Sequence, residues 1–279
     1  MAIEFDDVRQ VVDDVRLAHR GLPVWEAAAQ RFEVADPVPA IAGILSGFFS
    51  EVRGNVGWTQ VTTPPFRVSG VMVLSAPPDL TQPGARYVES TPEHKARIQR
   101  GVQLFYQLAR KAGDDWRGRL YLNGEPEQLW VMSEIAQLEK MDPDYLTHIC
   151  CGPRGMANSK THFTVLADHK LRNPHHPHKW DVPLLPELAK GVVVLVTSLY
   201  HVPRVWLTAQ RQFGLLAKSH GLPQQGFEVV GAKAGVDNFE EKVVGEIERI
   251  LRYAGAEGNG DIAWPWELPP TAAVALLAK

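Results

Sequence analysis

The sequence has very little cysteine: two residues, Cys150 and Cys151, that are adjacent. A disulfide framework needs more cysteines at wider spacing, so we predict a reduced chain without disulfides. Long apolar runs are also missing, since none reaches the ~20 residues that a membrane span needs. The first residues, MAIEFDDVRQ, are acidic rather than apolar, and we expect no signal peptide. These absences predict a cytoplasmic protein with no membrane partner.

Neither sign of charge is in excess. The 29 Lys and Arg residues nearly balance the 32 Asp and Glu residues, which leaves a net charge of −3. The basic excess typical of nucleic-acid-binding proteins is missing, so we predict no nucleic-acid partner. Three motifs are missing too: G-x-x-x-x-G-K-[ST], G-x-G-x-x-G after the first strand, and G-x-S-x-G. An ordinary ATP or NAD site and an α/β-hydrolase nucleophile elbow are therefore disfavoured.

The residues that are present favour a globular chain with a sizeable core, because 45% of them are hydrophobic. Over the first 65 residues the apolar positions show helical spacing, in pieces separated by prolines. From residue 66 onward, short β-branched runs alternate with amphipathic stretches, which predicts βαβ units. We expect the strands at residues 68–74, 119–124, 148–151, 192–197 and 227–230.

This alternation predicts an α/β fold. It is an open, doubly wound, mostly parallel five-stranded Rossmann-like sheet with an N-terminal helical extension. We expect the extension (1–65) to pack on the core, followed by the Rossmann-like domain (66–256) and a C-terminal tail (257–279). Residues 160–171 are predicted to be helical. Such sheets bind ligands beyond the carboxyl ends of their strands, so the residues that follow each strand are the candidates.

The most informative of these segments follows the fourth strand. Thr197 and Ser198 close the strand, and Tyr200, His201 and Arg204 open the next helix. A helix N-terminus attracts anions, and the arginine fork suits a carboxylate or phosphate. Ser198 is a candidate nucleophile with His201 as its base. The alternative is a histidine bonded to a carbonyl and a solvent-exposed arginine.

The stretch Thr-Ser-x-Tyr-His-x-Pro-Arg after a strand resembles the signature of the YdcF/SanA/ElyC family of bacterial proteins. Residues 71–74 resemble the family's first strand, and residues 96–105 resemble its following helix, which carries an arginine at the place of Arg97. The resemblance covers roughly residues 66–255. It implies a Rossmann-like parallel sheet and makes S-adenosylmethionine one candidate cofactor.

The chain departs from the family after the third strand. The family usually carries Ser-x-Asn-Thr-x-Glu-Asn there, and residues 158–164 match it only at Thr161. The family's glutamate is replaced by Phe163. An activity that needs that carboxylate would be lost or rebuilt in this chain.

Further candidate ligand-binding residues lie in the loops after the other strands. Ordinary structural roles remain as alternatives to ligand binding, namely a turn aspartate, a solvated loop arginine, and an N-cap formed by Asn158 or Ser159. These candidates are Asn123, Gly124, Asp79, Arg154, Lys160 and Thr161.

A proline-rich segment carries His175, His176 and His178. Three imidazoles suggest transition-metal binding, but ligands so close in sequence rarely complete a site without distant partners. We favour a surface loop and predict no metal site.

Two functions remain open. In the first, the chain is a hydrolase or group-transfer enzyme acting on a small anionic or nucleotide-like ligand, with His201, Ser198 and Arg204 as catalytic residues. In the second, the same pocket is a non-catalytic module that binds a nucleotide or S-adenosylmethionine. The sequence leaves the oligomeric state open.

Overall fold

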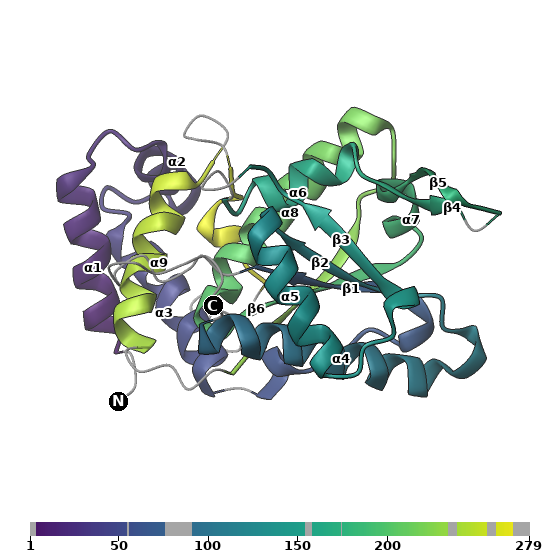
Figure 1. The fold of residues 1–279 in the computed structure, drawn as a ribbon. Helices are drawn as coiled ribbons and strands as arrows, with labels where there is room; N and C mark the ends of the chain where they lie inside the picture. The colour runs from purple at the N-terminus through teal and green to yellow at the C-terminus, as the bar shows by residue number, and fades with distance from the viewer. Residues whose placement is uncertain are drawn as a thin grey trace. The chain divides into compact units, whose positions relative to one another are not determined.

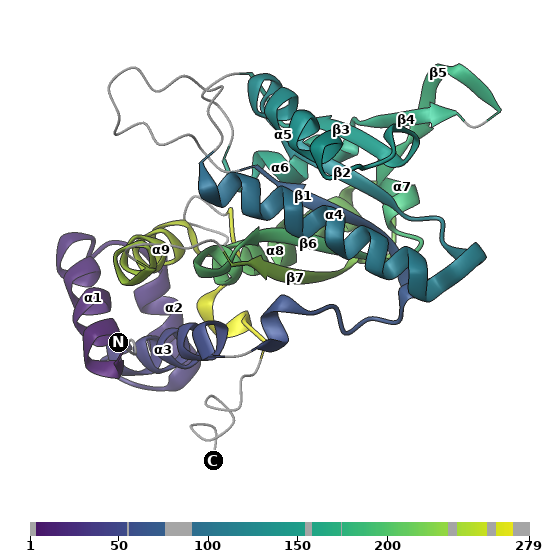
Figure 2. The same ribbon diagram turned by 60° about the horizontal axis from the view of Figure 1, so that its bottom comes forward.

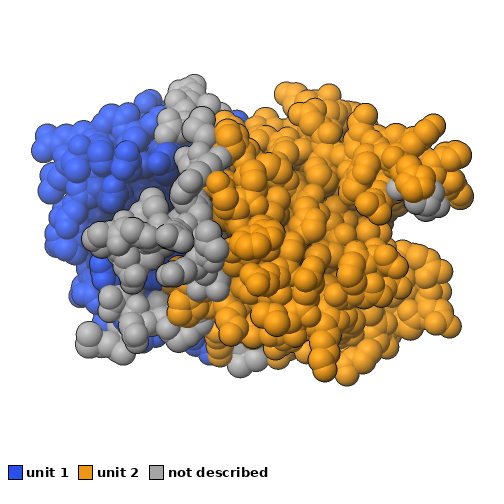
Figure 3. Space-filling model, in the orientation of Figure 1, with its two compact units in different colours: residues 1–58, 199–211, 236–279 blue, residues 59–198, 212–235 orange. Residues whose placement is uncertain are grey.

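The protein is an α/β chain built around a five-stranded sheet (Figure 1). It forms two compact units, coloured in Figure 3. Unit 1 comprises residues 1–58, 199–211 and 236–279, and unit 2 comprises residues 59–198 and 212–235. The structure is a computed structural model, and it describes residues 4–54, 56–75, 91–153, 158–173, 175–233, 239–255 and 261–269.

The sheet lies in unit 2, and all neighbouring strands in it are parallel. From one edge to the other its strands are β3 (Leu146–Cys150), β2 (Arg119–Gly124), β1 (Val68–Leu74), β6 (Val192–Ser198) and β7 (Gly226–Ala232). The chain builds outward from β1 to β3 and then returns to the other side of β1. This order is doubly wound, and the predicted fold class is confirmed.

Helices cover both faces of the sheet (Figure 2). On one face, Val71 and Val73 of β1 belong to the same apolar cluster as Ile98 and Val102. Gly101 lets that helix approach β1, because a Cβ there would stand 2.2 Å from Val73 Cγ2. The helices on this face are α4 (Pro92–Ala112) and α5 (Pro126–Leu138). The other face carries α6 (Thr161–Thr164), α7 (Leu184–Leu188) and the end of α8 (Val202–His220).

Helix α4 has well-defined signals at both ends. The Thr91 hydroxyl accepts a hydrogen bond from the His94 backbone N–H, and Pro92 occupies the first helical position. Gly113, with a φ of 60°, follows the last turn. This cap fixes the first turn of α4, which carries Glu93 and His94 and leads directly to Arg97.

The segment after the third strand differs from the prediction. The helix expected over residues 160–171 ends early: α6 gives way to a 3₁₀ turn over Val165–Ala167. The chain then forms an antiparallel hairpin of β4 (Lys170–Asn173) and β5 (His176–Pro183) in place of the expected loop. Cross-strand pairing, which includes a cation–π contact of Arg172 with Trp180 at 5.0 Å, overrides the local helical pattern.

Unit 1 is helical. Its helices are α1 (Phe5–Ala18), α2 (Pro23–Phe32), α3 (Val38–Gly54) and α9 (Phe239–Tyr253), joined by the 3₁₀ turn η6 (Leu199–His201) and the start of α8. Near the C-terminus, Trp266 packs edge-on against Phe32, with ring centroids 5.7 Å apart. The aromatic run near the end of the chain thus packs back onto α2. No helix in the described ranges is long and apolar enough to cross a membrane.

Candidate functional site

The carboxyl ends of β1 and β6 are adjacent at the point where the order of the sheet reverses, which is where open α/β sheets bind ligands. Arg97 reaches this point from α4. Its Nε donates to Ser198 Oγ at 2.8 Å, and its Nη1 donates to the carbonyls of Leu74 at 3.1 Å and Ser75 at 2.7 Å. The side chain is 1% exposed. A planar guanidinium with several fixed donors can join two strand ends in this way.

The Ser198 hydroxyl lies between a cation and a carboxylate. Besides accepting from Arg97, it is 3.5 Å from Glu93 Oε2, toward which it donates. Ser198 is almost fully buried, whereas Glu93 is partly accessible. A hydroxyl placed this way can pass its proton to the carboxylate while the arginine stabilises charge on the oxygen.

Two buried polar atoms in these elements have no hydrogen-bond partner among the described residues: Nε2 of His94, in the first turn of α4, and Oγ1 of Thr197, which precedes Ser198 on β6. His94 is 5% exposed and Thr197 is fully buried. Burial, and secondarily the charge of Arg97, lowers the pKa of His94 to about 4, so the imidazole is neutral at pH 7. Because buried polar atoms are normally paired, these two atoms are available to a ligand or a water.

At the end of β2, the side chain of Asn123 is used inside the protein. Its Nδ2 donates to the His162 carbonyl at 2.7 Å, and its Oδ1 lies 2.8 Å from Nδ1 of the same histidine. Asn123 therefore attaches α6 to β2. Next to it, a Cβ on Gly124 would stand 2.9 Å from the Cβ of Ser75, so the glycine permits close approach of the two strand ends.

The residues before α6 form a local cap. The Asn158 side chain accepts hydrogen bonds from the backbone N–H groups of Lys160 and Thr161, both at 3.0 Å. The Thr161 hydroxyl donates to the Asn158 carbonyl at 2.9 Å. These contacts form a local turn before α6, whose N-cap residue is Lys160. Two other expected ligand residues, Asp79 and Arg154, lie outside the described residues.

The residues of the Tyr-His-x-Pro-Arg motif lie in unit 1, around a buried carboxylate. Arg204 binds Glu246 of α9 with two contacts, Nε to Oε2 at 2.7 Å and Nη2 to Oε1 at 3.2 Å. Arg249 binds the same carboxylate at 3.0 Å, and His201 Nε2 lies 3.8 Å from it. The Tyr200 ring stacks beside His201 at 5.9 Å between centroids. Two donors of Arg204 are thus engaged with a protein carboxylate.

Comparison with known proteins finds no relative: no family model matches the chain, and no curated protein or solved structure matches it significantly.

Metal-binding groups do not gather in the described ranges, where no three His, Cys, Asp or Glu side chains are placed to share an ion. His176 and His178 belong to the β4–β5 hairpin, and His175 directly precedes β5. Both cysteines are free, and burial raises the pKa of the Cys151 thiol to about 12.

Sequence reasoning missed two members of the cluster at β1 and β6, namely Glu93 and His94, whereas Ser75 directly follows the strand expected at residues 68–74. The only signal for Arg97 was the arginine in the helix that resembles the family's. The Thr-Pro pair at residues 91–92 is the local sequence signal for the start of α4, and it places Glu93 and His94 in the first turn of that helix.

Proposed function

We propose that the chain binds a small anionic or nucleotide-like molecule at the carboxyl ends of β1 and β6, and acts on it as a hydrolase or group-transfer enzyme. One observation carries the proposal: Arg97 joins the two strand ends and holds the Ser198 hydroxyl, which in turn faces Glu93. The resemblance to the YdcF/SanA/ElyC family supports it, since that family has an arginine at the place of Arg97.

In this proposal Ser198 is the nucleophile. Its Oγ forms a bond to an electrophilic carbon or phosphorus of the ligand, its proton passes to the carboxylate of Glu93, and the bond to the leaving group breaks. The guanidinium of Arg97 stabilises the negative charge that develops. Neutral His94 and the Thr197 hydroxyl supply hydrogen bonds to the ligand without adding charge.

The residues of the Tyr-His-x-Pro-Arg motif have a structural role in this proposal. His201 and Arg204 stabilise unit 1 through Glu246 and do not contact the ligand. This assignment differs from the catalytic roles expected from the sequence, and it rests on the two contacts that Arg204 already makes with a carboxylate.

A second candidate function is a non-catalytic module that binds a nucleotide or S-adenosylmethionine. One observation favours it. Phe163, which stands where the family has glutamate, is fully buried and packs edge-on against Phe213, with centroids 5.3 Å apart. The carboxylate of the family is therefore replaced by part of the apolar core.

The test is a thermal-shift screen with nucleotides, sugar phosphates and S-adenosylmethionine. A ligand at ~100 times its dissociation constant adds ~2.7 kcal/mol of stability. We expect Arg97→Lys to lose this stabilisation, because the shorter ammonium cannot reproduce the planar contacts. Arg110→Lys, an exposed arginine on the same helix, is the matched control and keeps it.

Turnover of each stabilising ligand then separates the two functions. An enzyme loses at least ~10³-fold in turnover on Ser198→Ala while its affinity changes little. Ser133→Ala on α5 is the control. Stabilisation that no turnover accompanies supports the binding module. A ligand that stabilises wild type and Arg97→Lys equally would place the site elsewhere and overturn the proposal.

A further inference from the structure

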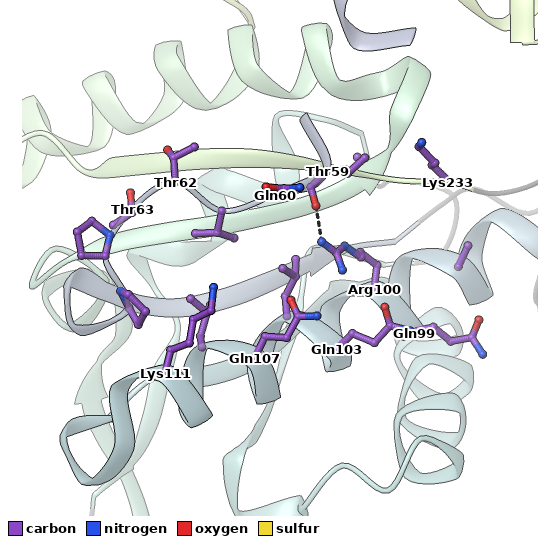
Figure 4. Close-up of a pocket in the computed structure, with 17 residues that line it drawn as sticks. Thr59, Gln60, Thr62, Thr63, Gln99, Arg100, Gln103, Gln107, Lys111 and Lys233 are labelled. Atoms are coloured by element: carbon purple, nitrogen blue, oxygen red, sulfur yellow. Dashed lines mark hydrogen bonds between the residues drawn. The ribbon is translucent and has the colours of Figure 1, made fainter. Parts of the chain in front are cut away.

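A groove with a volume of about 870 Å³ runs along α4 in unit 2 (Figure 4). One wall is α4 itself, and the other is formed by residues 59–65, which precede β1. Arg100 joins the two walls, because its Nη2 donates to the carbonyl of Thr59. This volume lies within the range of ~300–1,000 Å³ that is typical of ligand-binding pockets.

The groove is positively charged. Its described lining contains three cationic side chains, Arg100, Lys111 and Lys233, and no carboxylate. Two carboxylates lie nearby, and both accept hydrogen bonds from lining residues. Glu228 accepts four from Thr62 and Thr63, at 2.5–3.0 Å. Glu139 accepts one from Gln99 at 2.6 Å. The cations therefore dominate the charge that an occupant meets.

The spacing of these side chains suits an extended occupant. Figure 4 shows Lys111 and Lys233 at opposite ends of the groove. Arg100 and Lys111 are three helical turns apart on the same side of α4, which is a rise of ~16 Å. Gln103 and Gln107 lie between them, and both are exposed. An extended peptide covers that distance with ~5 residues.

The glutamines indicate the chemistry of the occupant. Each amide offers donors and an acceptor, which match the N–H and C=O groups of a peptide, whereas a phosphate chain offers acceptors only. The described lining contains no aromatic ring on which a nucleobase could stack. An amide-rich floor between cationic ends therefore favours an acidic peptide over a single-stranded nucleic acid.

We propose that this groove binds an extended acidic segment, about five residues long, of a partner protein, with acidic side chains near Arg100 and Lys111 and peptide groups on Gln103 and Gln107. This binding is separate from the proposed ligand site at the strand ends, and it does not depend on that site being catalytic.

The test uses the full chain and a fluorescein-labelled ten-residue peptide of alternating glutamate and serine, followed by fluorescence anisotropy. We expect saturable binding that weakens as salt is raised. Lys111→Glu removes one attraction and adds one repulsion, so we expect a loss of about tenfold in affinity, and about threefold for Lys111→Ala. Lys95→Glu, an exposed lysine of α4 outside the groove, is the control and changes affinity by less than about twofold.

The role of the amides is tested by Gln103→Ala combined with Gln107→Ala. This double variant should weaken binding of the peptide, which loses both donors and acceptors, more than binding of inorganic tripolyphosphate, which loses donors only. Because all these side chains are exposed, the variants should fold, and circular dichroism checks that they do. The proposal is overturned if the peptide shows no saturable binding at low salt, or if Lys95→Glu weakens it as much as Lys111→Glu. Tighter binding of a ten-nucleotide thymidine strand than of the peptide also overturns it, in favour of a nucleic-acid groove.

Discussion

Two arginines, Arg97 buried and Arg204 partly buried, make different kinds of contact in this protein. In unit 1, Arg204 binds the buried carboxylate of Glu246, which Arg249 also contacts, so the protein itself supplies the anion that Arg204 meets. In unit 2, Arg97 donates to two backbone carbonyls and a serine hydroxyl at the ends of two parallel strands. The first arrangement stabilises packing between helices, whereas the second places a guanidinium where a ligand of the sheet would lie. The same residue type therefore serves as a helix clamp in one unit and as a candidate ligand contact in the other.

The largest expected effect is the loss of stability when the Glu246 carboxylate, which holds Arg204 and Arg249, is removed. Glu246→Gln removes the carboxylate that Arg204 and Arg249 share in a buried setting, and we expect a loss of about 4 kcal/mol in the free energy of unfolding. Urea unfolding followed by circular dichroism measures it. Glu248→Gln is the control, because its ion pair with Arg252 is exposed and should contribute less than about 1 kcal/mol. Equal losses in the free energy of unfolding for the two variants would show that the buried contacts of Glu246 contribute no more than an exposed ion pair.

The next effect is the pH dependence of the free energy of unfolding, which comes from His94, three residues before Arg97 on α4. The pKa of His94 is about 4 in the folded chain and 6.5 for a solvated histidine, so the unfolded chain binds the proton first as the pH falls. Stability is therefore highest above pH 6.5 and decreases progressively between pH 6.5 and 4, by about 3 kcal/mol. The lowered pKa of His169, also due to burial, acts in the same direction.

His94→Gln should remove most of this pH dependence, and His220→Gln, at an exposed histidine, should leave it in place. The measurement is the midpoint of urea unfolding at several pH values between 4 and 8. If the urea midpoint of His94→Gln changes with pH as much as that of the wild type, the pH dependence does not come from this residue.

The smallest effect comes from the start of α4. Thr91→Ala removes the hydroxyl that caps the His94 N–H, and we expect a loss of about 1 kcal/mol in the free energy of unfolding. Thr164→Ala, at an exposed threonine of α6, should change it by less than about 0.5 kcal/mol. If the contacts of Arg97 need a fixed first turn of α4, Thr91→Ala also weakens binding of the ligand that the thermal-shift screen identifies. Unchanged stability would show that the cap contributes nothing.

Most of the fold could be predicted from the sequence because the sheet strands are short, β-branched apolar runs bounded by turns. The run over residues 192–197, for example, lies within β6. The β4–β5 hairpin could not be predicted in this way, since its residues are polar and its pairing depends on contacts between strands. Propensity is a weak guide where tertiary contacts decide the structure.

The candidate site was less predictable. Ser198 and Thr197 follow from the strand-end rule, because they close a recognisable strand. The carboxylate that Arg204 binds is not apparent from the motif, because Glu246 lies far along the chain on another helix. Arg97 is equally hard to predict, since helical periodicity would place a charged residue in solvent, whereas its polar acceptors at the strand ends allow it to be buried.

The reversal in strand order also has a consequence for synthesis on the ribosome. Val71 of the central strand pairs with Leu120 on one side and with Val194 on the other. The first partner emerges early, whereas the second emerges only after β3 and the β4–β5 hairpin have been made. During that interval β1, a largely buried apolar strand, has an open edge, which invites pairing with other chains. Slow translation between residues 124 and 192 would therefore favour aggregation of the nascent chain.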